Sequence, residues 1–577
     1  MTNWANQLLR GVVLAAALGA PAAGTAAGIS GDYLAARQAN YSGDYKAAAK
    51  YYGQAILLDP GNGDLMERGV LANLSLGDFD RAIALADQLS DGGFSSQIGY
   101  MAQMAGLAAS ENYSAILKQV DANKGVGVLI DGLVQAWSEL GQGDLSAALV
   151  KFDEVATIDG MGPFAAYHKA LALASVGDFE GAETIFAAGT AGGMQMTRRG
   201  TVARAEILSQ LDRNADAVAM IDESFGPDPD PGLSTLRADL AAGTRLPFSH
   251  ISGARDGLAE VFYTLAGALS NEMNDDFTLL YTRVAVYLRP DHVDALLLGA
   301  ELLEKLEQND LAVAAYKQVP RDNPAYYAAE LGRANALRAS GKVDAAVEVL
   351  EQLAETHGDL PLVQSTLGDL LRQQEHFEDA ITAYTRALDT FDEPNVTQWF
   401  LYYARAISHE RLDHWDESEA DFRAALELNP EQPQVLNYLG YSLVEKQQKL
   451  DEALNMIERA VAARPDAGYI VDSLGWVLYR LGRYQEAVGH MEHAAELMAV
   501  DPVVNDHLGD VYWAVGRKLE AQFQWKRALS FADWEDASEE ADTDRIRQKI
   551  AVGLDQVLRE EGSPPLEVAQ DSAVPSD

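Results

Sequence analysis

The chain has 577 residues, and 87 acidic residues outnumber 44 basic residues, which gives a formal net charge of −43. A surface of this sign repels phosphate backbones and anionic lipid headgroups, so it argues against nucleic-acid binding and membrane-surface binding. It favours partners with basic patches, although it also suits a surface that is simply well solvated. Cysteine is absent, which excludes disulfides, thiol catalysis, thiolate metal sites and a lipid-modified amino-terminal cysteine.

Residues 1–27 have the layout of a secretory signal peptide. Arg10 precedes an apolar run from Gly11 to Ala20, and Pro21 and several small residues with two candidate cleavage sites follow. The run is shorter than the roughly 20 apolar residues that a membrane-spanning helix needs. We therefore expect an exported chain with no stable membrane span. An uncleaved amino-terminal anchor or a cytoplasmic protein is the alternative.

A repeat of 34 residues organises most of the chain. Its small residues stand at Ala266, Ala300, Ala334 and Gly368, and the series resumes at Ala406, Gly440, Gly475 and Gly509. Weaker copies precede them at Ala36, Val70, Ala136, Ala170 and Ala205. A constant period of this length indicates one supersecondary unit stacked many times.

The unit is clearest in PLVQSTLGDLLRQQEHFEDAITAYTRALDTF, which begins at Pro361. Gly368 lies in a first helical segment, and Phe377 and Tyr384 follow in a second; in many copies a turn such as Gly43-Asp44 separates the two. A small residue lets the first helix approach the second, and an aromatic residue fills the gap between them. The pattern resembles the tetratricopeptide repeat, which implies an all-α fold: an α-solenoid, a right-handed superhelix of about 12 to 15 helix-turn-helix units.

The repeats form two predicted arrays, at 28–226 and 253–530. A joint rich in proline and glycine, 227–252, separates them, because prolines at this density break helices. Residues 531–561 read as an acidic linker and a helix with Ile546, Ile550, Leu554 and Leu558 on one face. We expect this helix to cap the open end of the solenoid, with docking to a partner as the alternative. Residues 562–577 are expected to be disordered.

The sequence offers no convincing active site. His409 and His414 are five residues apart, whereas a zinc-protease helix needs two histidines four apart. His490 and His493 have no cysteine or suitably spaced carboxylate beside them. No phosphate-binding loop and no nucleophile elbow is present. We therefore expect a protein that is not an enzyme and that uses no cofactor and no metal.

A solenoid offers a groove instead, and in the fold that the resemblance implies the first helix of each unit lines it. The inward positions of the last repeats combine aromatic and polar residues: Tyr403, Asn437, Tyr441, Asp472, Trp476, Tyr479, Asp506, Asp510 and Trp513. Aromatic rings bury area at low entropic cost, and carboxylates pair with lysine or arginine. We expect this groove to bind a basic and apolar segment of another protein. The alternative is that the aromatic residues pack between repeats and the aspartates cap helices.

The segment from Asn437 to Leu529, which contains NYLGYSLVEKQQKLDEALNMIERAV and VNDHLGDVYWAVGRKLEAQFQWKRAL, resembles a proteobacterial family of exported repeat proteins. One member of that family is an outer-membrane lipoprotein adaptor, which presents cell-wall hydrolases to a carboxyl-terminal processing protease. The resemblance implies a periplasmic scaffold or adaptor, with an envelope protease or cell-wall hydrolases as partners. The missing lipidation cysteine sets this chain apart from that adaptor. A protein that binds glycans or takes part in polysaccharide export is the alternative, because groove aromatics also stack on sugars.

Overall fold

The computed structural model of the chain describes residues 29–191, 196–226, 229–270, 274–532, 541–562 and 566. Every regular element in these ranges is a helix, from α2 to α32 with one short 3₁₀ helix, and successive helices pack in pairs. The predicted all-α fold of helix-turn-helix units is thereby confirmed. The predicted signal peptide at 1–27 lies outside the described residues, as do positions 533–540 of the acidic linker and most of the predicted tail.

The turn inside each pair ends one helix and starts the next. Gly77 has φ +82°, a left-handed conformation that glycine adopts without strain. The next residue, Asp78, caps the following helix, because its carboxylate accepts a hydrogen bond from the backbone N–H of Arg81 at 3.3 Å. Glu375 and Asp413 stand in equivalent turns with φ of +62° and +58°. The turn is therefore kept without glycine, at the steric cost that a side chain brings to this conformation.

Small residues at the repeated position are required by close approach between the two helices of a pair. A Cβ atom on Gly475 would stand 2.3 Å from the sulfur of Met491, and one on Gly509 would stand 2.4 Å from Nε1 of Trp525. Met491 and Trp525 belong to the second helix of their pairs and are fully buried. The spacing in the sequence thus marks the points where one helix backbone touches the other helix.

The chain divides into two compact units, and the boundary in the sequence falls between Val349 and Leu350. The amino-terminal unit is built from the following helices: α2 (Ile29–Tyr41), α3 (Tyr45–Leu58), α4 (Gly63–Leu76), α5 (Phe79–Asp91), α6 (Gln97–Ala109), α7 (Tyr113–Asp121), α8 (Val128–Gly141), α9 (Leu145–Ala156), α10 (Gly162–Ser175), α11 (Phe179–Ala191), α12 (Arg198–Gln210), α13 (Asn214–Phe225), α14 (Pro231–Ala241), α15 (Ala254–Leu269), α16 (Asp275–Leu288), α17 (Val293–Lys305), α18 (Asn309–Tyr316) and α19 (Tyr326–Ala339). Helix α20 (Val343–His357) contains the boundary.

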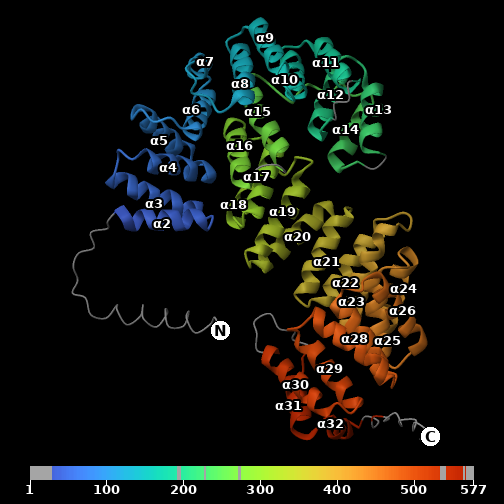
Figure 1. The fold of residues 1–577 in the computed structure, drawn as a ribbon. Coiled ribbons are helices and arrows are strands. Elements are labelled where there is room, and N and C mark those ends of the chain that lie inside the picture. The colour runs from blue at the N-terminus through green and yellow to red at the C-terminus, as the bar shows by residue number, and fades with distance from the viewer. Residues whose placement is uncertain are drawn as a thin grey trace, which may run out of the picture. The chain divides into compact units, whose positions relative to one another are not determined.

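Helices α15 and α16 lie on the face that the first helices of the earlier pairs form. Helix α15 contacts α8 and α10, and α16 contacts α4 and α6, so that these helices share one hydrophobic core (Figure 1). Tyr287 on α16 stacks on Phe79 with ring centroids 3.9 Å apart, and the Tyr45 hydroxyl donates to Asp276 at 2.5 Å. The face that would line the groove of this array is therefore largely filled by helices of the same chain.

A buried ionic cluster fixes α15 in this position. Glu260 on α15 is fully buried and accepts hydrogen bonds from Arg199 Nη2 and from the Tyr167 hydroxyl, both at 2.8 Å. Burial acts to raise the pKa of Glu260, but the Arg199 guanidinium and the hydrogen bond from His292 outweigh it and hold that pKa well below its usual value. Removing one partner of such a buried pair costs about 3–5 kcal/mol. The contacts that hold α15 in place are therefore part of the stable core of the unit.

The carboxyl-terminal unit is also built from helix pairs. Its helices are α21 (Pro361–Gln373), α22 (Phe377–Asp389), the 3₁₀ helix η1 (Val396–Gln398), α23 (Trp399–Arg411), α24 (Trp415–Leu428), α25 (Pro433–Glu445), α26 (Leu450–Ala463), α27 (Gly468–Arg480), α28 (Tyr484–Leu497), α29 (Pro502–Ala514), α30 (Lys518–Ala532), α31 (Thr543–Val552) and α32 (Leu554–Glu560). One core cluster runs from Ala406 on α23 to Leu554 on α32.

The end of this unit and the predicted joint both differ in detail from the sequence interpretation. Gly553, with φ +82°, divides the expected single capping helix into α31 and α32, which pack on the last full pair as a shortened repeat. The predicted joint at 227–252 contains α14. The arrays at 28–226 and 253–530 follow the repeat pattern, whereas the compact units follow the contacts, because α15 and α16 bury their apolar faces against the earlier helices.

Candidate functional site

A hollow of about 630 Å³ opens on the first helices of the pairs in the carboxyl-terminal unit. Side chains from α23, α25, α27 and α29 line it, together with residues at the ends of α25 and α28 and at the start of α29. Three of the predicted groove residues, Asn437, Tyr441 and Asp472, lie in this lining. The other lining residues are Glu410, Arg411, Tyr438, Ser442, Glu445, Lys446, Tyr469, Ser473, Met498, Asp501, Val503, Val504 and His507.

Asn437 lines the hollow and carries a buried hydrogen-bonding group without a partner. It lies on α25 one turn before Gly440, whose close contact with Ile457 of α26 fixes the helix position. The side chain is 8% exposed, and its Oδ1 atom has no hydrogen-bond partner among the described residues. A buried amide oxygen without a partner costs about 1–3 kcal/mol. A ligand that donates a hydrogen bond here recovers part of that cost.

Asp472 and His507 form an ion pair across α27 and α29. The Nδ1 atom of His507 lies 3.0 Å from Oδ2 and 3.2 Å from Oδ1 of Asp472. The imidazole ring stacks on Trp476 at 4.0 Å between centroids, with the planes 15° apart. Burial acts to lower the pKa of His507, but Asp472, with Asp506 and Asp510, outweighs it and raises that pKa above its usual value.

Three tyrosines, Tyr438, Tyr441 and Tyr469, line the hollow. Tyr438 and Tyr403 meet edge to face at 6.1 Å, and the Tyr438 hydroxyl donates to Glu410 at 3.4 Å. Tyr469 at the start of α27 is 44% exposed, so its ring is open to a ligand. Tyr403 is half-buried and also packs against Phe422 at 6.0 Å. These rings offer large apolar surface at low conformational cost.

Trp476 and Tyr479 are placed differently. Their rings stack on each other at 4.9 Å, and each residue is 8% exposed. The indole Nε1 of Trp476 donates to Glu445 at 2.8 Å, which joins α27 to α25. Trp476 therefore supports the hollow from behind, through His507 and Glu445, and Tyr479 packs against Trp476.

Asp506, Asp510 and Trp513 are engaged with the end of the chain. The ammonium of Lys549 on α31 lies 2.7 Å from Oδ2 of both aspartates and is fully buried. Asp510 also accepts a hydrogen bond from Trp525 at 2.9 Å. Trp513 packs on Trp525 at 5.3 Å, and Lys518 lies over its ring. The predicted pairing of these carboxylates with a basic group is present, but the basic group is the chain's own lysine.

The sequence interpretation did not include most of the residues that line the hollow, and three of these share one position in the repeat. His507 and Tyr438 stand two positions before the small residue of their repeats, as Ser473 does. The predicted inward positions lie three before, one after and four or five after that residue. Reading the position two before it as well identifies all three. The predicted role of the nine groove residues in binding stays a prediction.

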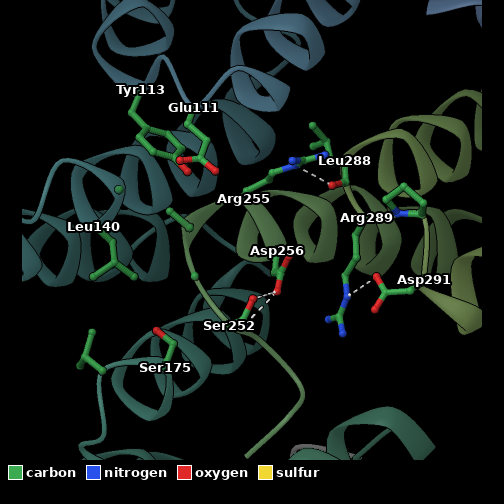
Figure 2. Close-up of a pocket in the computed structure, with 15 residues that line it drawn as sticks. Glu111, Tyr113, Leu140, Ser175, Ser252, Arg255, Asp256, Leu288, Arg289 and Asp291 are labelled. Atoms are coloured by element: carbon green, nitrogen blue, oxygen red, sulfur yellow. Dashed lines mark hydrogen bonds and ion pairs between the residues drawn. The ribbon is translucent and has the colours of Figure 1, made fainter.

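A second hollow, of about 680 Å³, lies in the amino-terminal unit where the ends of α8, α10 and α16 meet the starts of α7 and α15 (Figure 2). Its basic groups are already engaged. Arg255 Nε donates to the carbonyl of Leu288 at 2.8 Å, and Arg289 Nη1 donates to the carbonyl of His250 at 2.5 Å. Arg289 also lies 3.2 Å from Asp291. These bonds tie α15 and α16 to their surroundings, so we assign no ligand to this hollow.

Within the described ranges, no helix combines the length and the apolar character needed to cross a membrane. Over the same residues, no group of three or more histidine, cysteine, aspartate or glutamate side chains is arranged to hold a metal ion.

Comparison with known proteins identifies the class of this chain. A family model described as "Tetratricopeptide repeat" matches residues 33–93, 284–361, 365–407 and 443–497, and a second model of that description matches 399–432. Together with the helix pairs, these matches make the chain a tetratricopeptide repeat protein, a class that generically serves as a scaffold for protein interactions and is usually non-catalytic.

Curated relatives share only part of their length with it. TPR repeat-containing protein PA4667 of Pseudomonas aeruginosa is 28% identical over 207 residues, which are 35% of this chain and 34% of that protein. Aspartyl/asparaginyl beta-hydroxylase of Mus musculus is 26% identical over 204 residues, 33% of this chain and 27% of the hydroxylase. The chain thus spans about a third of the length of the Pseudomonas protein and about a quarter of that of the hydroxylase. Among solved structures, the APC/C hetero-tetramer Cut9-Hcn1 has a TM-score of 0.37 and 15% identity, and the match covers 90% of this chain and 95% of that chain.

Proposed function

We propose that the chain is a non-catalytic adaptor that binds segments of other proteins in the hollow of its carboxyl-terminal unit. The observation that carries this proposal is the Asn437 side chain, whose buried Oδ1 atom lacks a partner in a hollow lined by tyrosines. An extended segment has backbone N–H groups to donate to this oxygen and side chains to pack on the rings.

The amino-terminal array offers little free surface for a partner, which also favours the hollow of the carboxyl-terminal unit as the binding site. Helices α15 and α16 occupy most of the corresponding face of the amino-terminal array, with Phe79, Tyr45 and Trp137 in contact with them. A partner would have to displace a continuous hydrophobic core to bind there. The hollow of the carboxyl-terminal unit needs no such displacement.

The proposed setting is the cell envelope. The layout of residues 1–27 supports export, and the resemblance over Asn437 to Leu529 supports a periplasmic adaptor that presents substrates to an envelope protease. Fractionation of cells and amino-terminal sequencing of the mature chain test the export step. A full-length chain that remains in the cytoplasm with residues 1–27 intact would contradict it.

A crosslinking pull-down from the cell envelope tests the binding function. The baits are the wild-type chain, Asn437→Ala, and Asn455→Ala as a matched control, because Asn455 is exposed on α26, the second helix of the same pair. We expect a protease or cell-wall hydrolase with wild type and with Asn455→Ala, and a clear loss with Asn437→Ala. Equal recovery by all three baits would place binding outside the hollow.

Binding of a glycan is the second candidate, and the exposed ring of Tyr469 favours it, because sugars stack on such rings. The same pull-down separates the two. Recovery of polysaccharide without protein, lost with Tyr469→Ala, would replace the adaptor by a glycan-binding protein.

A further inference from the structure

His507 has one satisfied nitrogen and one free nitrogen. Both carboxylate oxygens of Asp472 lie on Nδ1, at 3.0 and 3.2 Å, so this nitrogen carries a proton in either charge state of the ring. No described residue forms a hydrogen bond with Nε2, although the His507 side chain is only 12% exposed. The residue lines the hollow, and its ring lies flat on Trp476. The group that remains for a ligand is therefore Nε2.

The charges around His507 favour its protonated form. Asp472 faces it from α27, and Asp506 and Asp510 lie on its own helix. Lys549 of α31 is bonded to the latter two carboxylates, and Glu445 of α25 reaches the same stack through Trp476. Two arginines also reach these carboxylates, Arg545 of α31 at 3.6 Å from Asp510 and Arg480 of α27 at 3.6 Å from Glu445. The nearby carboxylates still prevail, since Asp472, Asp506 and Asp510 together raise the pKa of His507, and the face of an indole ring also attracts a cation. As an imidazolium, His507 has a second N–H, on Nε2, to donate.

We propose that His507, held by Asp472, is a specificity-determining residue of the hollow and donates from Nε2 to an acceptor oxygen of the bound segment. This inference rests on the proposed binding function. It differs from the expectation that carboxylates of the groove select a basic segment, because Asp472, Asp506 and Asp510 are already paired within the chain. Asn437 and His507 then act together: the amide oxygen accepts from the ligand, and the imidazolium donates to it.

The acceptor is a carbonyl or a carboxylate oxygen. In either case binding is linked to protonation, because the neutral ring with Nδ1 protonated has no proton on Nε2. Affinity falls as the pH rises through the titration of His507. A hydrogen bond to a charged donor changes affinity by about tenfold or more.

The test uses a peptide selected from a random display library on the intact chain at about pH 6. Its affinity is measured by calorimetry at about pH 6 and about pH 9 for the wild-type chain, His507→Gln and Asp472→Asn. We expect the wild-type affinity to fall about tenfold or more on this change, and the dependence to disappear with His507→Gln. Thermal unfolding of each variant shows that it is folded. Amidation of the peptide carboxyl terminus and replacement of its acidic residues by amides identify a carboxylate acceptor; a carbonyl acceptor is insensitive to both.

Two failures are distinguishable. A peptide that loses affinity for Asn437→Ala but binds the wild-type chain equally at both pH values overturns the role of His507 and leaves the hollow as the binding site. If no peptide is enriched, or if enriched peptides bind Asn437→Ala as well as the wild type, the proposed function fails and this inference with it.

Discussion

A methyl group on Gly257 of α15 would stand 2.2 Å from the indole ring of Trp137 on α8. Trp137 is fully buried, and its Nε1 atom is bonded to His168. The backbone of α15 therefore rests directly on the ring, which is possible only because residue 257 has no side chain. The seating of α15 on the amino-terminal array depends on this contact.

Gly257→Ala is expected to destabilise the amino-terminal unit by about 2 kcal/mol. Overpacking at a buried contact costs about 1–3 kcal/mol, and this loss exceeds the gain of up to about 1 kcal/mol that alanine brings to a helix. Chemical denaturation together with hydrogen exchange in α8 and α15 measures the effect.

Gly267→Ala is the matched control for that substitution. Gly267 lies on the same helix, is exposed, and has no atom within 4 Å of an added Cβ. It should gain up to about 1 kcal/mol from helix propensity alone. Effects of the same sign at both glycines would show that helix propensity, not the contact with Trp137, controls the docking of α15.

His168, which is buried beside Trp137, makes the stability of the amino-terminal unit depend on pH. Burial lowers the pKa of His168 from 6.5 to about 4. The folded state resists protonation that the unfolded chain accepts, so the stability of the unit is complete above about pH 6.5 and falls as the pH drops towards 4. At about pH 4 the protonation of His168 lowers the free energy of unfolding by about 3 kcal/mol, since one pKa unit corresponds to about 1.4 kcal/mol.

Urea midpoints between pH 7 and pH 4, followed by hydrogen exchange in α10, check this window. His168→Gln cannot bind a proton, so its midpoint should be lower at neutral pH but less dependent on pH than that of the wild type. Parallel pH profiles for the two proteins would exclude His168 as the source of the acid sensitivity.

The repeat pattern predicted the helix pairs because each small residue reports a local contact. Gly475 and Gly509 mark backbone approaches to Met491 and Trp525, within a single pair. The docking of α15 on α8 joins residues more than a hundred positions apart, and no period connects Gly257 with Trp137. A pattern of 34 residues carries no information on such a contact, so the compact units were not predictable from it.

The candidate site shows the same limit. Asn437, Tyr441 and Asp472 were identified because inward positions follow from helical geometry. Whether an inward carboxylate is free depends on what the next helix presents, and here Lys549 bonds to Asp506 and Asp510. The spacing of apolar residues predicted the last helix, but it did not predict which carboxylates Lys549 on that helix would pair with.

Turns without glycine offer a route to stabilisation. Glu375 holds φ +62° in the turn after α21, and a side chain in this conformation costs about 1 kcal/mol or more. Glu375→Gly should raise the stability of the carboxyl-terminal unit by about 0.5–1 kcal/mol, measured as a shift in the denaturation midpoint. The reciprocal change is Gly482→Ala, where φ is +74° and an added Cβ meets no atom within 4 Å. A loss of similar size is expected there, and a neutral result at both sites would contradict the argument from backbone strain.

Lys549 is expected to hold the carboxyl-terminal cap. Its ammonium is fully buried against Asp506 and Asp510, with the latter carboxylate only 1% exposed. Lys549→Ala removes the cation that bridges the two carboxylates and leaves Asp510 with the more distant Arg545, 3.6 Å away. Breaking a buried pair in this way costs about 3–5 kcal/mol. Because a solenoid repeat is stabilised by its neighbours, the loss should concentrate in α29 to α32. Hydrogen exchange there should accelerate about a hundredfold or more, while α21 and α22 stay protected.

Lys526→Ala controls for the removal of a lysine from the same part of the chain. Lys526 is exposed on α30, so its loss should change stability by no more than about 0.5 kcal/mol. If Lys549→Ala leaves exchange in α31 unchanged, other contacts of the cap, such as the buried side chains of Ile546 and Leu554, hold it, and the buried ion pair contributes no net stability. That outcome is physically reasonable only if water reaches the two carboxylates after truncation, because a charge that remains buried without a partner destabilises the fold.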